Sequence, residues 1–301
     1  MTAAVTGATG LVGRFIVEKL VEEGVAVRAW RRPGSDIGGL PSAVEWIEGD
    51  LQSPASVAKL VAGADMLVHS ALDHLPGRYR GGEGEDLAHF LKTNVGASLA
   101  LLATGRAAGV RRCVFISSRA VFGGWAGAGK ISDDDCVRPD SNYGAAKAAV
   151  EAFVQSWGLA GGWPIAALRP TGVYGLVFPA SKSKWFDLVG CALRGEAVPA
   201  RSGTEVHGRD VAESVWRILR AETGQVAGRM FNCSDVAVST RDIVQLVHRI
   251  GGASGPLPDE CPAPKNVMDC DGLKRLGVAF GGWPLFERTI AELVSAAKAR
   301  A

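Results

Sequence analysis

The chain has 301 residues, 47% of them apolar, so it can bury one large core or one core with a smaller appended domain. Its 33 basic and 31 acidic residues nearly balance and form no extended basic block, which argues against a nucleic-acid or membrane-surface partner. No apolar run approaches the ~18 residues of a membrane span, and the first residues enter a strand-like run without a signal peptide, so we expect a cytoplasmic protein.

The cysteines and histidines show no spacing typical of metal ligands. The six cysteines form no Cys-x-x-Cys pair, and several lie in apolar runs where cysteine acts as a small hydrophobic residue. His69 and His74 are five positions apart, which is poor for a shared helical face. We therefore expect reduced cysteines and no metal site.

Residues 3–24 predict a strand, a tight turn and a helix, because a short apolar run precedes a glycine-rich turn and apolar residues then recur at helical spacing. Such glycines permit the turn, let the backbone approach a pyrophosphate and let the helix pack on the strand. The helix N-terminus adds unpaired N–H groups for phosphate oxygens. Because the pattern opens a βαβ series, it predicts a dinucleotide-binding site. The expected cofactor contacts in this turn are Gly7, Thr9, Gly10, Leu11, Val12 and Gly13.

The second predicted strand, residues 25–30, is followed by Arg31 and Arg32. In an NAD site the end of this strand usually carries an acidic residue for the ribose hydroxyls, whereas a basic residue can accept the 2′-phosphate of NADP. The two arginines therefore favour NADP. NAD is the alternative if both are ordinary solvated side chains.

Two further strand ends supply expected cofactor contacts. The third strand, residues 44–47, alternates as a half-buried edge strand does and leads to Asp50 and Leu51, where an adenine amino group could be met. The fourth strand, residues 66–71, ends in Ser70 and Ala71, which we also assign to the cofactor site.

A long loop, residues 72–85, follows the fourth strand. A loop at the carboxyl end of a parallel strand is a place for substrate contacts, which makes Arg78 a candidate, although an ordinary surface excursion explains the loop equally well. The next helix, about residues 86–108, includes Asn94, whose polar side chain interrupts a small and apolar pattern. Helix starts are also predicted at Ser53-Pro54 and at Ser239, which has Asp242 three positions later.

The stretch from residue 113 to residue 147 brings a hydroxyl, a phenol and an ammonium into one sequence. A short buried strand breaks before Ser118, and a polar loop leads to Tyr143 and Lys147, which share one face if their segment is helical. A nearby ammonium stabilises the phenolate, so a tyrosine with an ordinary pKa near ~10 exchanges protons nearer neutral pH. Ser118 would then donate a hydrogen bond to the substrate oxygen. Alone, a Tyr-x-x-x-Lys match is weak, because many helices carry one as packing.

Six motifs resemble, in order, those of extended short-chain dehydrogenases/reductases, the epimerase/dehydratase group. They are residues 7–13, 94–96, 116–123, 143–147, 168–175 and 206–212. The resemblance covers nearly the whole chain and implies an α/β fold, a Rossmann-type doubly wound parallel sheet with a smaller C-terminal substrate-binding lobe. It implies an NAD(P)-binding domain in residues 1–175 and a lobe mainly in residues 176–301, with segments near 206–233 returning to the Rossmann core.

The resemblance also implies roles for single residues. Ser118, Tyr143 and Lys147 correspond to the catalytic Ser, Tyr and Lys of this family, and Tyr143 follows Ser118 by the expected 25 positions. Asn94 would help to position the central helix and a water on the cofactor side. Members of the family often dimerise through the helices that here carry Asn94 and Tyr143, so we expect a homodimer. The backbone from Pro170 to Val173 would border the nicotinamide, and the substrate contacts would be Arg119, Ala120, Arg78, His207 and Arg209.

Neighbouring residues separate the reactions of this family. The 4,6-dehydratases place Asp-Glu where this chain has Arg119-Ala120, and related decarboxylases use a glutamate at the position of Ala120. Sugar-nucleotide epimerases typically carry, in place of Gly172, an asparagine that helps to hold the diphosphate. The predicted function is therefore an NADP-favouring oxidoreductase that interconverts a hydroxyl and a carbonyl on a small sugar-like or sugar-acid substrate. A nucleotide-sugar epimerase is the alternative, and a non-catalytic NADP-sensing regulator is a weaker third.

Overall fold

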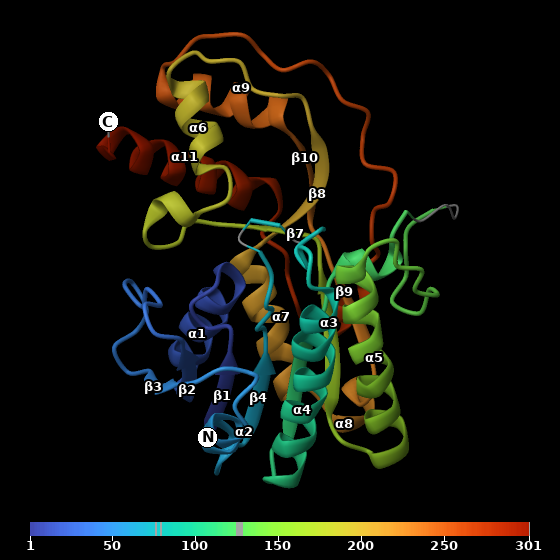
Figure 1. The fold of residues 1–301 in the computed structure, drawn as a ribbon. Coiled ribbons are helices and arrows are strands. Elements are labelled where there is room, and N and C mark those ends of the chain that lie inside the picture. The colour runs from blue at the N-terminus through green and yellow to red at the C-terminus, as the bar shows by residue number, and fades with distance from the viewer. Residues whose placement is uncertain (76, 79, 125–128, 301) are drawn as a thin grey trace.

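The computed structural model describes residues 1–75, 77–78, 80–124 and 129–300. Within them, seven strands form a central sheet and three strands form a smaller one (Figure 1). The central order β3-β2-β1-β4-β5-β6-β9, with every neighbouring pair parallel, is that of a doubly wound dinucleotide-binding fold. This confirms the predicted fold class.

The central sheet contains strands from both ends of the chain. Its members are β1 (Thr2–Thr6), β2 (Ala26–Arg31), β3 (Glu45–Glu48), β4 (Met66–His69), β5 (Arg112–Ile116), β6 (Ile165–Pro170) and β9 (Met230–Cys233). The smaller sheet contains β7 (Gly172–Tyr174), β8 (Ser202–His207) and β10 (Val236–Ser239). β9 lies beyond β6 at the edge of the central sheet, so the chain returns to that sheet after it has formed β7 and β8.

Helices cover both faces of the central sheet (Figure 1). Ala3 and Val5 of β1 face one cluster of buried residues and Ala4 faces the other, which is the alternation that a strand buried on both faces requires. α1 (Leu11–Glu22) and α7 (Gly208–Arg220) belong to the first cluster. The second contains α2 (Pro54–Val61), α4 (Ser98–Ala107) and α5 (Asn142–Gly161).

A third cluster of buried residues joins the smaller sheet to α6 (Phe186–Leu193), α9 (Thr240–Gly251) and α11 (Gly282–Arg300). Figure 1 shows this layer above the edge at which the central strands end. The remaining short helices are α3 (Leu87–Leu91), η1 (Lys92–Ala97), η2 (Arg119–Phe122), η3 (Ala180–Lys182), α8 (Thr223–Val226) and α10 (Asp271–Arg275). The substrate region of such a fold is expected between the two layers.

Helix starts follow the predicted capping residues. Ser53 caps α2 by accepting a hydrogen bond from the backbone N of Ser56, with Pro54 as the first helical residue. Ser239 and Asp242 form a capping box at the start of α9. The predicted helix over about 86–108 is confirmed: α3, the π-helical turn η1 and α4 follow one another without a break from Leu87 to Ala107, and η1 contains Asn94.

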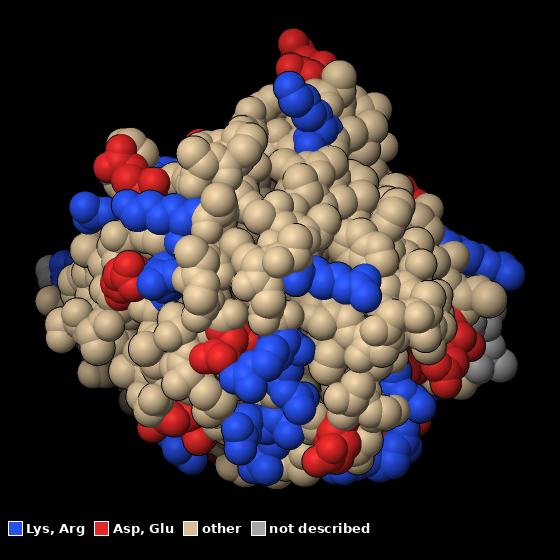
Figure 2. Space-filling model, turned by 90° about the horizontal axis from the view of Figure 1, so that it is seen from below, with Lys and Arg blue, Asp and Glu red and all other residues tan. Residues whose placement is uncertain are grey.

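Charged side chains of both signs are mixed on the surface. On the face that Figure 2 shows, lysines and arginines lie beside aspartates and glutamates among mostly uncharged atoms. In the part of the chain that the structure describes, no helix is both long enough and apolar enough to cross a membrane.

Candidate active site

The glycine-rich turn between β1 and α1 lies tightly against the end of β4. Gly7 has φ +71°, and a Cβ on it would lie 2.7 Å from the backbone N of Ala71. A Cβ on Gly13 would overlap the carbonyl group of Gly7. Glycine is therefore required at both positions, at Gly7 by conformation and contact and at Gly13 by the close packing of the helix on the turn.

The N-terminus of α1 has no side-chain cap. Its N-cap is Gly10, whereas Ser53, Ser141 and Ser239 cap α2, α5 and α9 through their side chains. The first N–H groups of α1, together with the positive end of the helix dipole, therefore remain for an external anion. The turn fits the pyrophosphate of a dinucleotide.

A buried chain of hydrogen bonds connects the end of β1, directly before this turn, to the end of β4 and to the start of α4. His69 contacts Thr6 Oγ1 through Nδ1 and Ser98 Oγ through Nε2, both at 2.8 Å. Burial, with a smaller effect from the Lys147 charge, lowers the pKa of His69 to about 3, so the imidazole is neutral. Thr6 Oγ1 also accepts hydrogen bonds of 3.2 Å from the backbone N of Ser70 and of Ala71. The predicted cofactor contacts Ser70 and Ala71 are thus fixed beside the turn.

Arg14 is a positioning residue that the sequence analysis missed. It lies on α1, is 2% exposed, and donates hydrogen bonds of 2.6 Å to the carbonyl oxygens of Asp36 and Gly38. A weaker bond of 3.3 Å reaches the carbonyl of Thr9. Arg14 therefore joins the glycine-rich turn to the loop after β2. The sequence feature that could have identified Arg14 is its charge, because it directly follows Gly13 in a buried segment of the helix.

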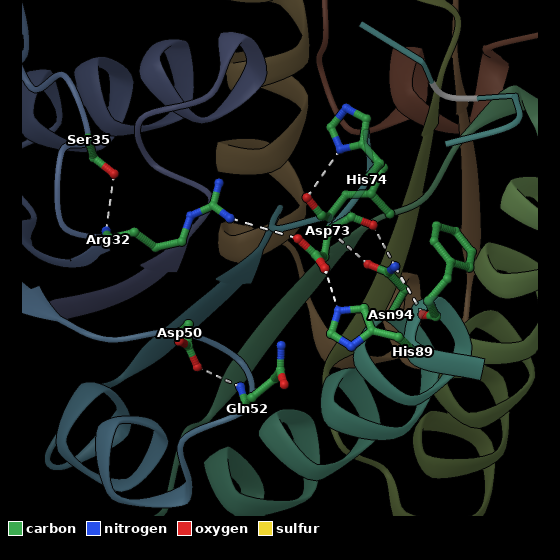
Figure 3. Close-up of polar contacts among 10 residues, drawn as sticks. Arg32, Ser35, Asp50, Gln52, Asp73, His74, His89 and Asn94 are labelled. Atoms are coloured by element: carbon green, nitrogen blue, oxygen red, sulfur yellow. Dashed lines mark hydrogen bonds and ion pairs between the residues drawn. The ribbon is translucent and has the colours of Figure 1, made fainter. Parts of the chain in front are cut away.

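The end of β2 carries both arginines that predicted NADP. Arg31 and Arg32 are exposed, and the backbone N of Arg32 donates to Ser35 Oγ at 3.1 Å. The guanidinium of Arg32 lies 3.8 Å from Asp73, which in turn contacts His89 Nε2 at 3.0 Å (Figure 3). Because β1 lies between β2 and β4 in the sheet, the Arg32–Asp73 pair links two segments that follow strands on opposite sides of β1.

Asp50 shapes the turn before α2. Its Oδ1 accepts hydrogen bonds from the backbone N of Gln52 at 2.8 Å, drawn in Figure 3, and of Ser53 at 3.1 Å. The side chain is exposed, whereas Leu51 is 8% exposed and belongs to the core. Contact of these two residues with adenine stays a prediction.

The side-chain amide of Asn94 binds the loop after β4 through both its oxygen and its nitrogen. Its Oδ1 accepts from the backbone N of Asp73 at 2.8 Å, and its Nδ2 donates to the carbonyl of Asp73 at 2.7 Å (Figure 3). Nδ2 also donates to the carbonyl of Phe90 at 3.1 Å. π-Helical turns occur often at functional sites, and here the turn contains the residue that positions Asp73 opposite Arg32.

Two of the predicted catalytic residues, Ser118 and Lys147, lie at the end of β5, and Tyr143 lies one helical turn before Lys147. Ser118 follows this strand and caps η2, because its Oγ accepts a 3.1 Å hydrogen bond from the backbone N of Ala120. Tyr143 and Lys147 lie one turn apart on α5. The Nζ of Lys147, which is 6% exposed, donates a 2.8 Å hydrogen bond to the carbonyl of Ile116, the last residue of β5.

Close packing holds α5 against the segment that contains Ser118. A Cβ on Gly144 would overlap the carbonyl oxygen of Ala120. Any larger residue would therefore push the start of α5 away from η2. The glycine after Tyr143 thus permits the close approach of α5, which carries Tyr143, to η2, which Ser118 caps.

The environment of Lys147 lowers its basicity. Burial reduces the pKa of Lys147 to about 8, and the negative charge of Glu151 opposes this effect. The ammonium lies 4.7 Å from the centre of the Phe115 ring, within cation–π distance. Glu151 is held by two hydrogen bonds of 2.9 Å from the guanidinium of Arg169. Below pH 8 the site therefore contains a buried positive charge.

The predicted substrate contacts lie in different environments. Arg119 is half-buried at the start of η2, where burial, followed by the charge of Arg80, lowers its pKa. Ala120 is half-buried beside it, whereas Arg78 and Arg209 are exposed. Substrate contact by these residues stays a prediction.

His207 has a structural function that the sequence analysis did not identify. It is 3% exposed, its ring centre lies 5.0 Å from that of Tyr174, and its Nδ1 accepts a 3.0 Å hydrogen bond from the backbone N of Arg209. His207 thereby caps α7. Burial lowers its pKa to about 4, so it is neutral at pH 7.

The segment from Pro170 to Val173 leads the chain from the central sheet to the smaller one. Pro170 is buried at the end of β6, and Val173 is half-buried in the middle of β7. Since parallel strands end at one edge, this segment belongs to the same edge as Gly7 and Ser118.

The strand order, the uncapped glycine-rich turn and the Ser, Tyr and Lys residues at the end of β5 define an NAD(P)-binding enzyme of the extended short-chain dehydrogenase/reductase type. The model of the NAD dependent epimerase/dehydratase family matches residues 3–234, and the chain belongs to this family. The family membership confirms the predicted resemblance.

Curated relatives carry names from more than one reaction class. The chain is 37% identical over 124 residues to Sterol demethylase protein B of Methylococcus capsulatus, an alignment of 41% of this chain and 36% of that protein. It is 30% identical over 177 residues to a 3-beta-hydroxysteroid dehydrogenase of Mycolicibacterium neoaurum, covering 57% and 47%. The matched part spans less than half the length of either relative.

A solved structure shares the whole fold. UDP-glucose 4-epimerase from Thermotoga maritima, crystallised with UDP-glucose, superposes with a TM-score of 0.80 over 100% of this chain and 99% of that one. The sequence identity is 20%, so the likeness concerns the fold.

Proposed function

We propose that this chain is an NADP-favouring oxidoreductase that interconverts a hydroxyl and a carbonyl group on a small sugar-like or sugar-acid substrate. Its catalytic residues are Ser118, Tyr143 and Lys147. The observation that carries the proposal is the 2.8 Å hydrogen bond from Lys147 to Ile116, which fixes a buried ammonium one helical turn from Tyr143 and beside the strand end before Ser118.

Each catalytic residue has one task. Tyr143 takes the proton of a substrate hydroxyl in oxidation and returns it in reduction. Ser118 donates a hydrogen bond to the same oxygen; its Oγ already accepts from the N–H of Ala120, so its own hydrogen is directed to another acceptor. Lys147 stabilises the phenolate of Tyr143 by its charge and meets the nicotinamide ribose. The nicotinamide, when bound, supplies the hydride chemistry.

The preference for NADP rests on the end of β2. Two exposed arginines and the hydroxyl of Ser35 stand together there, and these are donors of the kind that bind a phosphate. Arg14 fixes the loop that follows them. NAD remains the alternative cofactor, and the Arg31 variant described in the Discussion separates the two.

A second candidate function is nucleotide-sugar epimerisation. A UDP-glucose 4-epimerase of Corynebacterium glutamicum is 26% identical over 290 residues, which cover 89% of this chain and 85% of that protein. An epimerase oxidises and re-reduces its substrate on one retained cofactor, whereas an oxidoreductase releases the cofactor in its changed form. The two functions therefore differ in net cofactor turnover.

The deciding experiment incubates the purified protein with NADP(H) or NAD(H) and a panel of sugars, sugar acids and nucleotide sugars. Hydroxysteroids join the panel because of the names of the curated relatives. Absorbance of the reduced nicotinamide is followed while products are analysed. We expect a net absorbance change with one non-nucleotide substrate. Product from a nucleotide sugar without such a change would instead support the epimerase.

A homodimer through the helices that carry Asn94 and Tyr143 is also proposed. Phe153 and Leu159 on α5 are 44% and 69% exposed, and Leu87 and Leu91 on α3 are 41% and 42% exposed. Large apolar side chains at this exposure favour burial against a second protein surface. A second copy of the chain would cover them.

A further inference from the structure

Two charged side chains fill the space beside Gly172. A Cβ on this residue would overlap the carboxylate of Glu205 and would lie 2.5 Å from Nζ of Lys184. The family resemblance implies that sugar-nucleotide epimerases typically carry, at the position of Gly172, an asparagine that helps to hold the diphosphate. In this protein the volume of such a side chain is occupied, so the missing asparagine and the two charged groups are linked features of one site.

The two charged groups form an ion pair at the candidate active site. Glu205 lies on β8 opposite Gly172 of β7, and Lys184 precedes α6. Their side chains are 12% and 30% exposed, respectively. Burial raises the pKa of Glu205, and the charge of Lys184 acts in the opposite direction. Because the segment from Pro170 leads directly to Gly172, the pair borders the region proposed for the nicotinamide.

An unusual backbone conformation directly follows Lys184. Trp185, directly after it, has φ +69°, and no other described residue except glycine has a positive φ. Residues with side chains seldom adopt this conformation, and such strain is frequent at functional sites. The Trp185 ring stacks on the Tyr174 ring, with 5.2 Å between the two ring centres. Nζ of Lys184 lies 5.0 Å from the centre of the Trp185 ring. The ammonium is thus held by an aromatic face and by Glu205.

We propose that the Lys184–Glu205 pair determines substrate specificity. It occupies the position that a substrate diphosphate would take, and it binds the hydroxyl groups of a substrate that lacks a diphosphate. The proposal rests on the proposed active site, since the pair acts only if substrate binds at that edge of the sheet. It does not depend on the choice between NADP and NAD.

Charge and volume both support this role. A diphosphate placed beside Gly172 would meet a carboxylate that is only 12% exposed, and repulsion between like charges is strong where water is scarce. Lys184, the group that would attract the diphosphate, is already paired. A carboxylate accepts hydrogen bonds from hydroxyl groups, so Glu205 suits an uncharged, hydroxylated part of a substrate. The proposed substrates are thereby narrowed to hydroxy compounds without a nucleoside diphosphate.

The test is calorimetric titration with UDP. The protein is first saturated with whichever dinucleotide it binds, so that UDP cannot enter the cofactor site. We expect Glu205→Ala, which removes charge and volume, to bind UDP at least tenfold more tightly than the unaltered protein. Glu205→Gln keeps the volume and should gain about threefold. Glu213→Ala removes another lysine-paired carboxylate, on α7, and should leave the UDP affinity unchanged.

A kinetic arm uses the substrate found in the turnover screen. Glu205→Gln should raise its KM at least fivefold with kcat within twofold, because the carboxylate binds substrate without taking part in proton transfer. Equal UDP affinity in the unaltered protein and in a folded Glu205→Ala, as judged by dinucleotide binding, would overturn the proposal. If Glu205→Ala does not fold, unchanged UDP affinity and KM in Glu205→Gln would do so. Absence of net redox turnover would refute the oxidoreductase function and leave the UDP titration interpretable.

Discussion

Lys147 and Ile116 are joined by a hydrogen bond of 2.8 Å between the lysine Nζ and the isoleucine carbonyl oxygen. This bond connects the helix that carries Tyr143 to the strand end that precedes Ser118. Because the ammonium is buried, its pKa is about 8 and its ordinary value is 10.5. The proposed site therefore contains a positive charge that depends on pH within the range in which most enzymes work.

The first prediction concerns pH. Lys147 is charged below its pKa of about 8 and becomes neutral as the pH rises through this value, so support for the Tyr143 phenolate is then lost. At saturating cofactor, we expect kcat/KM for substrate oxidation to fall as the pH rises through about 8, which gives the pH profile an alkaline limb. Lys147→Arg stays charged, since arginine keeps its proton to about pH 12 or above, and should lower the rate and remove this limb. An unchanged limb in that variant would assign it to another group.

Tyr143→Phe should reduce kcat by about 10²–10⁴, the usual contribution of a positioned acid–base group, while the Kd for the dinucleotide changes little. Tyr174→Phe is the matched control. The Tyr174 hydroxyl is buried and has no hydrogen-bond partner in the described structure, so its removal should leave turnover within twofold. Steady-state kinetics and fluorescence titration with the reduced cofactor provide the two readouts. Turnover by Tyr143→Phe at the unaltered rate would refute the mechanism.

Local relationships could be predicted from the sequence, whereas distant ones could not. The glycine spacing of the turn and the four-residue interval between Tyr143 and Lys147 are properties of one loop and one helix, so a linear pattern contains them. The contacts of Arg14 with the 36–38 loop, and of Glu205 with the space beside Gly172, join separate segments. Such contacts depend on tertiary packing, which no periodicity encodes.

Asn94 shows an intermediate case. Its polar side chain interrupts a small and apolar sequence pattern, and in the structure it lies in the π-helical turn η1 within the expected helix. The side chain binds the backbone of Asp73, which lies 21 positions earlier. A propensity argument indicates that a buried asparagine needs partners, and only the fold shows which ones they are.

Arg14→Met should lower the free energy of unfolding by about 2 kcal/mol, because hydrogen bonds from a charged donor to the carbonyls of Asp36 and Gly38 are lost. The loop after β2 would also loosen, so dinucleotide affinity should fall severalfold. Urea unfolding and cofactor titration measure the two effects. Arg28→Met removes an arginine–carbonyl bond to Ala62 at a more exposed site and should cost less than about 1 kcal/mol. Equal losses in both variants would contradict a special role for Arg14.

Arg31→Asp should shift the ratio of kcat/KM for NADP to that for NAD toward NAD. Loss of a charge-assisted hydrogen bond to the 2′-phosphate costs about 1.5–3 kcal/mol, which corresponds to roughly a 10–100-fold change. Arg249→Asp makes the same charge reversal on α9, where Arg249 pairs with Glu287, and should not change the ratio. If Arg31→Asp also leaves the ratio unchanged, another residue reads the phosphate, and Arg32 is the next variant to make.

Phe153→Glu should convert a dimer into a monomer. Phe153 is 44% exposed on α5, and a carboxylate placed in a buried apolar interface cannot be solvated there. Size-exclusion chromatography with light scattering should give twice the chain mass for the unaltered protein and the single mass for the variant. Leu257→Glu places the same charge at a site that is 38% exposed, outside the helices, and should remain dimeric. A monomeric unaltered protein would refute the proposed dimer, and a dimeric Phe153→Glu would move the interface to another surface.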